Sequence, residues 1–408
     1  MKRFFFIVSF LLAVSFGNKV RGEGFRPSYE LGGYISTMPY LYITDDSALW
    51  QVLVHNRLNF TGFVSEKFTV SVQMRNQLIA GDFAELIDIN EGFSRENYFL
   101  PLTGKKKFGD NYLLTSSIDR FWLQYTVDKL EIKIGRQRIN WGQTFVWNPN
   151  DIFNSYNFFD FDYPERPGAD AIRLQYYTSY TSSLDLAAKV DSAGNFSGGG
   201  LFKFTKWNTE IQLLAGYYSN SNSLVFSDTM PSFDWKTEDL VAGAGFSAGI
   251  GKMSLRGEWS YLHSLRENSD STNQFLGSIA VDYTLGSKTS MMFEFFYNSK
   301  VQLSGASLFS LYEGSQNIKT LSFTRYNIFG QVSYPIIPIL NATLSGMYFF
   351  DNDLIGFFAG PSVELSLGDN LSLATFLQSF AFKYENPFTL KKEWLNATYA
   401  YLRLKWNF

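Results

Sequence analysis

The chain of 408 residues contains no cysteine, only two histidines and few charged residues, which make up 18% of the chain. The absence of cysteine excludes disulfide bonds, thiolate metal sites and a lipid-anchored N-terminal cysteine. Soluble domains usually carry about 25% charged residues, so this composition is atypical of one. The net charge of −3 indicates no particular partner, and we expect no nucleic-acid binding.

Residues that commonly carry catalysis are also sparse. His55 and His263 are far apart in the chain, and nothing marks the serine partner that a Ser–His–acid hydrolase needs. No glycine-rich phosphate loop precedes a helix and no Cys/His metal spacing occurs. Asn150 and Asp151 alone provide too few oxygen ligands for calcium. We therefore predict a protein that is not an enzyme and that has no metal site and no cofactor, with a barrel enzyme as a remaining alternative.

The N-terminus has the features of a secretory signal. Lys2 and Arg3 precede an apolar run from Phe4 to about Phe16, and Gly17 or Gly22 offers a cleavage site. A membrane-spanning start helix is the alternative, but the run is too short for the ~20 apolar residues that one needs, and no later run approaches that length. We predict a signal peptide over residues 1–22 and one domain over residues 23–408.

Aromatic residues, in contrast, are abundant: 41 Phe, 24 Tyr and 9 Trp make up 18% of the chain. The C-terminal segment alternates strictly, with Leu402, Leu404 and Trp406 on one side of a strand and Arg403 and Lys405 on the other. A helix would space its apolar residues three or four apart. An exported, aromatic-rich chain without a transmembrane helix fits a transmembrane β-barrel, with apolar side chains toward lipid and polar ones toward the lumen.

The same alternation recurs in about eighteen segments. Short connections alternate with long ones, and this is the rhythm of periplasmic turns and extracellular loops. We predict an all-β, antiparallel up-and-down barrel of about 16–18 strands with both ends in the periplasm. The predicted segments start near 29, 50, 67, 114, 130, 170, 183, 199, 210, 238, 253, 273, 289, 324, 339, 355, 371 and 394.

The barrel must be closed, because the hydrocarbon core of a bilayer offers no hydrogen-bond partner to an unpaired backbone N–H or C=O group. The last strand must therefore pair with the first, near residues 29–38. A soluble β-propeller or β-helix is the alternative architecture. Neither predicts the signal, the terminal Phe408 or the unequal connections.

Strand parity predicts which charged side chains line the lumen. One wall of the barrel is expected to be basic and the opposite wall more acidic, an arrangement that favours anions. The plainer alternative is that any porin needs a polar lining. The predicted basic wall comprises Arg57, Arg75, Arg120, Lys133, Arg136, Arg138, Arg173, Lys189, Lys203, Arg403 and Lys405, and the opposite wall comprises Glu258, Glu294 and Glu364.

The third long connection, residues 142–169, is rich in aromatic and acidic residues. So apolar a loop should pack on something, and we predict that it folds into the lumen and narrows it. A cap over the barrel rim is the alternative. Its carboxylates would face the basic wall and set up a transverse field. The predicted constriction residues are Trp147, Asp151, Phe159, Asp160, Asp162 and Glu165.

Parity alone would turn Arg136 and Arg138 outward, toward lipid. A β-bulge at Gly135 would reverse the register and turn both arginines inward. We therefore predict a bulge at Gly135.

Two short motifs frame this loop. The strand end Gly135-Arg136-Gln137, the following Gly142, the loop that bears Trp147 and the return Asp170-Ala-Ile-Arg173-Leu174 resemble the alginate-export family of outer-membrane barrels and related monomeric porins. The resemblance implies an eighteen-stranded single-chain barrel that passes anionic or polar solutes. It also implies that Arg136 and Arg173 line the pore.

Together these features predict an outer-membrane porin of a Gram-negative cell for passive diffusion of small hydrophilic, anionic solutes. Its expected partners are outer-membrane lipid, the solutes, and the barrel assembly machinery through the strand ending at Phe408. An energy-coupled receptor is not expected, because strands begin soon after the cleavage site. The alternatives are an export channel for an anionic polysaccharide and a surface glycan-binding barrel with a blocked lumen.

Overall fold

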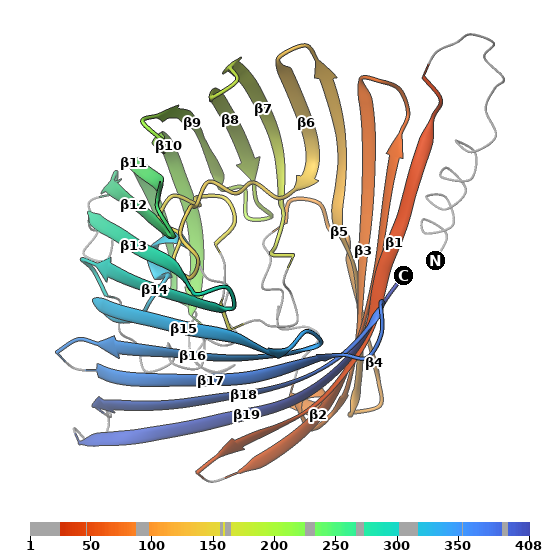
Figure 1. Ribbon diagram of the computed structural model, residues 1–408, viewed down its shortest axis with the longest axis vertical. Coiled ribbons are helices and arrows are strands. Elements are labelled where there is room, and N and C mark those ends of the chain that lie inside the picture. The colour runs from red at the N-terminus through yellow and green to blue at the C-terminus, as the bar shows by residue number, and fades with distance from the viewer. Residues whose placement is uncertain are drawn as a thin grey trace.

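The computed structural model describes residues 25–45, 47–86, 98–155, 158–159, 165–224, 233–266, 273–301, 317–352, 354–385 and 391–408. The predicted signal peptide, Asp160 and Asp162 lie outside these ranges. The strands form one antiparallel sheet that closes on itself as a barrel (Figure 1).

Eighteen strands make the closed wall, as predicted. Each pairs with its neighbours in sequence, and β3 pairs directly with β5. The wall strands are β1 (Ser28–Thr44), β2 (Ala48–Phe63), β3 (Phe68–Gly81), β5 (Tyr112–Val127), β6 (Leu130–Gln137), β7 (Ala169–Ser179), β8 (Ser182–Val190), β9 (Phe196–Lys206), β10 (Thr209–Leu224), β11 (Phe233–Ile250), β12 (Met253–Ser264), β13 (Gln274–Leu285), β14 (Thr289–Asn298), β15 (Tyr326–Ile337), β16 (Leu340–Phe350), β17 (Leu354–Ser366), β18 (Leu371–Glu385) and β19 (Lys392–Asn407).

The predicted starts at 130, 253, 289 and 371 coincide with those of β6, β12, β14 and β18.

The prediction missed a nineteenth strand. Within the second long connection, β4 (Thr103–Phe108) pairs with the first half of β5, next to the place where β6 ends early. The same connection holds the helix α2 (Asp82–Leu86), and a 3₁₀ turn, η1 (Ile318–Thr320), precedes β15. No helix among the described residues is long and apolar enough to span a membrane.

The ring closes between the two ends of the chain. Strands β1 and β19 pair in antiparallel register from Tyr34 opposite Asn407 to Thr44 opposite Ala397. At the seam, Gly33 and Phe408 exchange two backbone hydrogen bonds of 3.0 Å. Closure gives both edge strands partners, which the apolar part of a bilayer requires.

The two faces of the wall differ as the alternation predicts. On β19, the side chains of Leu402, Leu404 and Trp406 are 49%, 39% and 48% exposed on the outer face. Tyr399 and Tyr401, of opposite parity, are buried on the inner face. An apolar exterior with polar and aromatic side chains inside is the arrangement of a membrane barrel.

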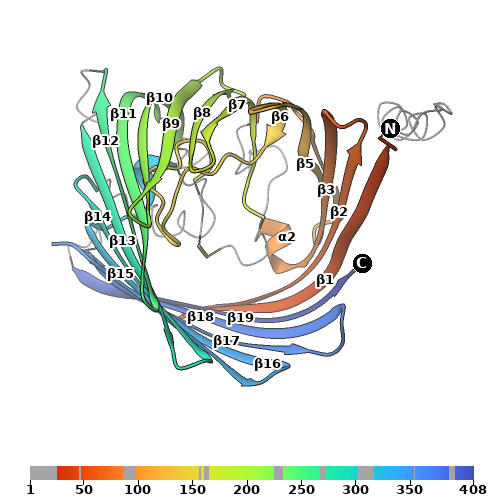
Figure 2. The same ribbon diagram turned by 45° about the horizontal axis from the view of Figure 1, so that its top comes forward.

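The third long connection lies inside the ring of strands (Figures 1 and 2). Its apolar residues, from Ile139 to Phe159, form one buried cluster with inward-facing residues of the wall. Wall partners such as Leu201, Leu262 and Phe296 come from β9, β12 and β14. The loop therefore fills part of the lumen, as predicted, and does not cap the rim.

This packing takes up much of the interior. Inward-facing charges alone would suggest a solvated lumen, yet the buried cluster reaches from β7 through β18. Of the described residues, those of β1, β2, β3, β5, β6 and β19 contribute nothing to it. The interior thus has two parts, a packed half beside β7 to β18 and a half beside β1, β2, β3, β5, β6 and β19 that we call the polar half because it carries Arg57, Arg75, Arg403 and Lys405. The polar half also holds a smaller buried cluster of Met38, Leu53, Tyr399 and Tyr401.

The closure of the barrel can be tested at Gly33. A β-carbon at position 33 would lie 2.0 Å from the carbonyl oxygen of Arg57 on β2, which has no room to move away. We expect Gly33→Ala to lower the fraction of chain that folds, because β1 would be pushed from β2 at the seam. Heat modifiability on a denaturing gel measures that fraction. Gly330→Ala is the matched control, since a β-carbon there meets nothing within 4 Å, and equal folding of the two variants would contradict the expectation.

Candidate functional site

Glu294 anchors the loop to the packed half of the barrel. It projects inward from β14, is 0% exposed, and accepts hydrogen bonds from three successive backbone N–H groups, those of Phe145 (3.0 Å), Val146 (2.9 Å) and Trp147 (2.9 Å). The hydroxyl of Ser278 donates a fourth, at 2.8 Å. A tight turn removed from water leaves its N–H groups without partners, and this carboxylate supplies them.

Glu258 does the same from β12. It accepts from the backbone N–H of Thr144 (3.1 Å), the amide of Asn148 (3.2 Å) and the backbone N–H of Asn150 (3.3 Å), and it also contacts the hydroxyl of Thr144. Both carboxylates therefore hold one turn, residues 144–150, against the wall. We call this arrangement the carboxylate clamp.

The clamp corrects the predicted acidic wall. Glu258 and Glu294 face inward, but each is 0% exposed beneath the loop and neither meets open water. Glu364, the third predicted member, is exposed and lies near the short-turn end of β17. A signal for this was present in the sequence, because Leu262 and Phe296 share the inward parity of Glu258 and Glu294. Large apolar residues on the inner face indicate that something packs there.

Aromatic contacts complete the packing of the loop. The ring of Trp147 stacks on Phe296 at 5.4 Å between centroids, and Phe159 meets Phe358 edge-on at 5.2 Å. Trp141 is fully buried against Phe153. Such pairs are each worth about 0.5–1.5 kcal/mol beyond the area that they bury, so the loop is held firmly in the packed half.

Two of the predicted pore-lining cations also hold the loop. Arg173 on β7 pairs with Asp185 on β8 at 2.5 Å, and Asp185 accepts a 3.0 Å hydrogen bond from the indole of Trp141. The ammonium of Lys189 donates to the carbonyl oxygen of Phe153 at 2.7 Å. Both contacts fix the loop to β7 and β8.

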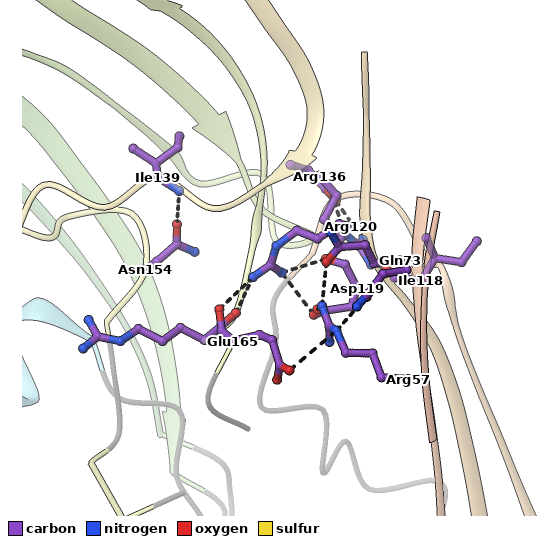
Figure 3. A network of polar contacts seen from close by, with 12 residues as sticks. Arg57, Gln73, Ile118, Asp119, Arg120, Arg136, Ile139, Asn154 and Glu165 are labelled. Carbon is purple, nitrogen blue, oxygen red and sulfur yellow. Dashed lines mark hydrogen bonds and ion pairs between the residues drawn. The ribbon is translucent and has the colours of Figure 1, made fainter. Parts of the chain in front are cut away.

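At the other end of the loop, a network of charges joins it to the polar half (Figure 3). Arg57 on β2 pairs with Asp119 on β5 at 2.6 Å, and Arg120 pairs with the same carboxylate at 3.1 Å. Arg120 also donates to the carbonyl oxygens of Glu165 (3.1 Å) and Arg166 (2.5 Å). Arg57 and Arg120 are 1% and 5% exposed, so they act as buried anchors of the wall and loop.

Asp119 is brought into this network by an irregularity of β5. The pairing of β3 with β5 passes from Gln73 opposite Arg120 to Met74 opposite Ile118, and Asp119 is the extra residue. A bulge of this kind re-aims a side chain without ending the strand.

The predicted bulge at Gly135 is wrong. The register of β6 with both β5 and β7 is continuous through Gly135 and Arg136. Gly135 is required for a different reason: its φ is +117°, and a β-carbon there would lie 2.2 Å from the carbonyl oxygen of Phe121.

Arg136, although its parity is outward, does not contact lipid. It is 0% exposed, and its guanidinium binds both oxygens of Asp170 at 2.8 and 3.0 Å. The carbonyl oxygens of Ile118 and Leu100 accept further hydrogen bonds, and the ring of Tyr98 covers the guanidinium at 3.6 Å. The segment before β4 thus covers the end of β6 and supplies partners for this arginine. Strand parity cannot predict this contact.

The remaining predicted cations are partly exposed. Arg403 lies over the ring of Phe376 at 4.9 Å, Lys405 over Tyr34 at 4.0 Å and Lys133 over Trp122 at 4.4 Å. Aromatic faces stabilise such cations and fix their positions. The partly exposed set comprises Arg75, Lys133, Arg138, Lys203, Arg403 and Lys405.

Two acidic residues of the loop have different surroundings. Glu165 is 27% exposed and lies near Arg57 and Tyr34. Asp151 is buried, and one of its oxygens accepts from the backbone N–H of Asn154 at 3.3 Å. Burial raises the pKa of Asp151 to about 7, against the opposing attraction of Arg166 and Arg138.

Catalytic and metal chemistry finds no further support. His55 is buried against Tyr34, with 5.1 Å between ring centroids. Within the described ranges, no group of three or more His, Asp or Glu side chains is arranged to hold a metal ion. The absence of enzymatic activity stays a prediction.

Solved structures share this architecture. OpdK of Pseudomonas aeruginosa, solved with vanillate, is 11% identical, with a TM-score of 0.51, 93% of this chain covered and 99% of that chain. OccAB1 of Acinetobacter baumannii is 10% identical (TM-score 0.56, 95% and 98% covered). OccK2 of P. aeruginosa, in complex with glucuronate, is 9% identical (TM-score 0.54, 93% and 97% covered). No protein-family model and no curated protein matches the chain.

At such identities the likeness concerns the fold. It supports the broader prediction, a β-barrel of the outer-membrane porin type, and gives no support to the narrower resemblance to alginate exporters. The motifs around Gly135 and Asp170 are explained by local packing instead, since Arg136 and Asp170 form a buried ion pair.

The carboxylate clamp is testable by truncation. Glu294→Ala removes the acceptor of three buried N–H groups, and each unsatisfied group costs about 1–3 kcal/mol. We expect the turn of residues 144–150 to leave the wall, which should raise single-channel conductance and its noise in a planar bilayer. Glu364→Ala, which removes an exposed carboxyl near the short-turn end of β17, should leave both unchanged. If Glu294→Ala keeps the conductance and the current noise of the wild type, the clamp does not position the loop.

Asp151 gives the loop a pH dependence. Its pKa in the packed loop, about 7, exceeds the ordinary value of 3.8, so the packed state binds a proton that the released state loses more readily. The stabilisation of the packed loop should therefore be complete below about pH 3.8, decline as pH rises from there to about 7, and change no further above that. Limited proteolysis of the loop in detergent-solubilised barrels, measured at several pH values across this window, checks this. Asp151→Asn should remove the dependence, and an unchanged pH profile in that variant would assign it to another group.

Proposed function

We propose that the protein is an outer-membrane channel for passive diffusion of small hydrophilic, anionic solutes. One observation carries the proposal: the apolar residues of the loop pack against the packed half of the barrel, and partly exposed cations line the polar half. A path beside β1, β2, β3 and β19 would pass Arg75, Arg403 and Lys405. Cations along a narrow path with low-dielectric walls favour anions.

Two structural neighbours support the choice of solute. OpdK was solved with vanillate and OccK2 with glucuronate, and both molecules are small, polar carboxylates. Guanidinium and ammonium groups recognise carboxylates through charge-assisted hydrogen bonds. We propose the same class of solute for this barrel.

The proposed location follows from the exterior. An apolar outer face, which includes Leu402 and Trp406, suits outer-membrane lipid. The signal peptide of residues 1–22 and delivery to the barrel assembly machinery through the strand that ends at Phe408 are parts of this proposal.

The two alternatives from the sequence are less favoured. A polysaccharide exporter needs a wide lumen, whereas the clamp and the aromatic cluster hold the loop inside the lumen and narrow it. A glycan-binding barrel with a blocked lumen gives no reason for partly exposed cations inside.

Ion selectivity tests the proposal. Replacing Arg75 and Arg403 together by glutamine should lower the chloride-over-potassium permeability ratio by roughly twofold or more, since both charges lie on the polar half. The reversal potential in a KCl gradient across a planar bilayer measures this ratio. Lys252→Gln, in the short turn after β11, removes a charge outside the lumen and should leave the ratio unchanged. A wild-type barrel that conducts no ions at all would overturn the proposed function.

A further inference from the structure

The contacts of Glu165 with the wall are long, although a guanidinium and a phenol hydroxyl are good hydrogen-bond donors to a carboxylate. The loop carboxylate lies 3.8 Å from Nε of Arg57, and the hydroxyl of Tyr34 lies 3.4 Å from its other oxygen. Charge-assisted bonds normally measure about 2.7–2.9 Å. Figure 3 shows the Glu165 side chain pointing toward Arg57. Its exposure of 27% leaves it in reach of solvent.

Asp119 contacts the same guanidinium in a different way. It pairs with Arg57 at 2.6 Å and is 2% exposed. Nη2 of Arg57 also donates to Gln73 at 2.7 Å, and Nε donates to Asn59 at 3.0 Å. Asp119 is therefore a structural partner of Arg57, whereas Glu165 is a weak second one.

Arg57 keeps an unused donor. Its Nη1 is buried and has no hydrogen-bond partner among the described residues. A buried donor without a partner costs about 1–3 kcal/mol, and more on a charged group. An acceptor that reached Nη1 would recover that cost, and the loop carboxylate, near Nε, does not.

The local charge favours an anion at this place. Arg57 and Arg120 carry two positive charges, and Asp119 carries one negative charge, so one positive charge is left for Glu165 to balance. The ammonium of Lys405, 4.0 Å from the ring of Tyr34, adds positive potential on the same side. Exchange of the Glu165 carboxylate for that of a solute would leave the charge balance unchanged.

We propose that Arg57 and Tyr34 form a carboxylate-binding subsite that Glu165 occupies when no solute is bound, and that a permeating monocarboxylate displaces Glu165 from it. The inference rests on the proposed function, because it places one binding step along the proposed path. A tethered carboxylate competes at an effective concentration in the millimolar range. Glu165 therefore weakens solute binding and speeds release, which suits a channel that must let its solute leave.

Removal of the competitor tests the subsite. In Glu165→Gln, benzoate should block the chloride current of single channels at a concentration about threefold to tenfold lower than in the wild type, because the internal carboxylate is gone. Benzamide, which has the same shape and no charge, should block the two proteins alike. Glu364→Gln is the matched control: it loses an equal charge on the inner face far from Arg57 and should keep the wild-type benzoate concentration.

A second variant examines the donors. Tyr34→Phe keeps the ring that contacts His55 and Lys405 and removes only the hydroxyl. Introduced into Glu165→Gln, it should raise the blocking concentration of benzoate again by about threefold to tenfold. Equal benzoate block in wild type and Glu165→Gln, or an equal gain in Glu364→Gln, would overturn the subsite.

The failure of the channel itself is distinguishable. If the wild-type barrel carries no chloride current, the proposed function fails, and the subsite is examined by calorimetric titration of benzoate into the detergent-solubilised barrel. Tighter binding by Glu165→Gln than by wild type and Glu364→Gln would then still support it, and equal binding would overturn it.

Discussion

A hydrogen-bonding group that leaves water needs a partner, and this requirement acts twice in the barrel. On the outside it forces closure, since β1 and β19 can have no free edge in hydrocarbon. On the inside it governs the third long connection, whose turn at residues 144–150 is buried among apolar side chains. There Glu258 and Glu294 supply the acceptors that water would otherwise supply. The loop's position, and with it the division of the lumen, depends on these two carboxylates.

Because the lumen is divided in this way, cations that look alike in the sequence have different roles: some form buried ion pairs and others stay partly exposed. Arg57, Arg120 and Arg136 are buried in ion pairs with Asp119 or Asp170. Losing one partner of such a pair costs several kcal/mol, because the other charge is left unpaired in a poorly solvated place. Those arginines hold the wall and loop together. The cations that remain partly exposed on the polar half, such as Arg75 and Arg403, lie beside the proposed path of the solute.

Glu165 lies where the two roles meet. It belongs to the loop, yet it contacts Arg57 of the wall at ion-pair distance only, without a short hydrogen bond. A contact of this strength can be exchanged for a similar one, whereas the pair of Arg57 with Asp119 cannot be exchanged without disturbing β5. The same guanidinium can therefore be structural toward one carboxylate and exchangeable toward another.

Composition and alternation together predicted the barrel. Alternation also predicted its inner and outer faces, because a period of two residues is a local property of the backbone. The inward path of the loop also followed from its composition, since so many aromatic residues need something to pack against. Tertiary structure decided which residues each of these side chains contacts. Glu258 and Glu294 have inward parity in any register, but only the folded loop turns them from lumen-facing charges into buried acceptors. Likewise, Arg136 has outward parity. The register of β6 with β7 places Asp170 opposite it, and the segment before β4, distant in sequence, covers it. Parity gives the direction of a side chain, whereas the partner that it meets depends on contacts between residues far apart in the chain.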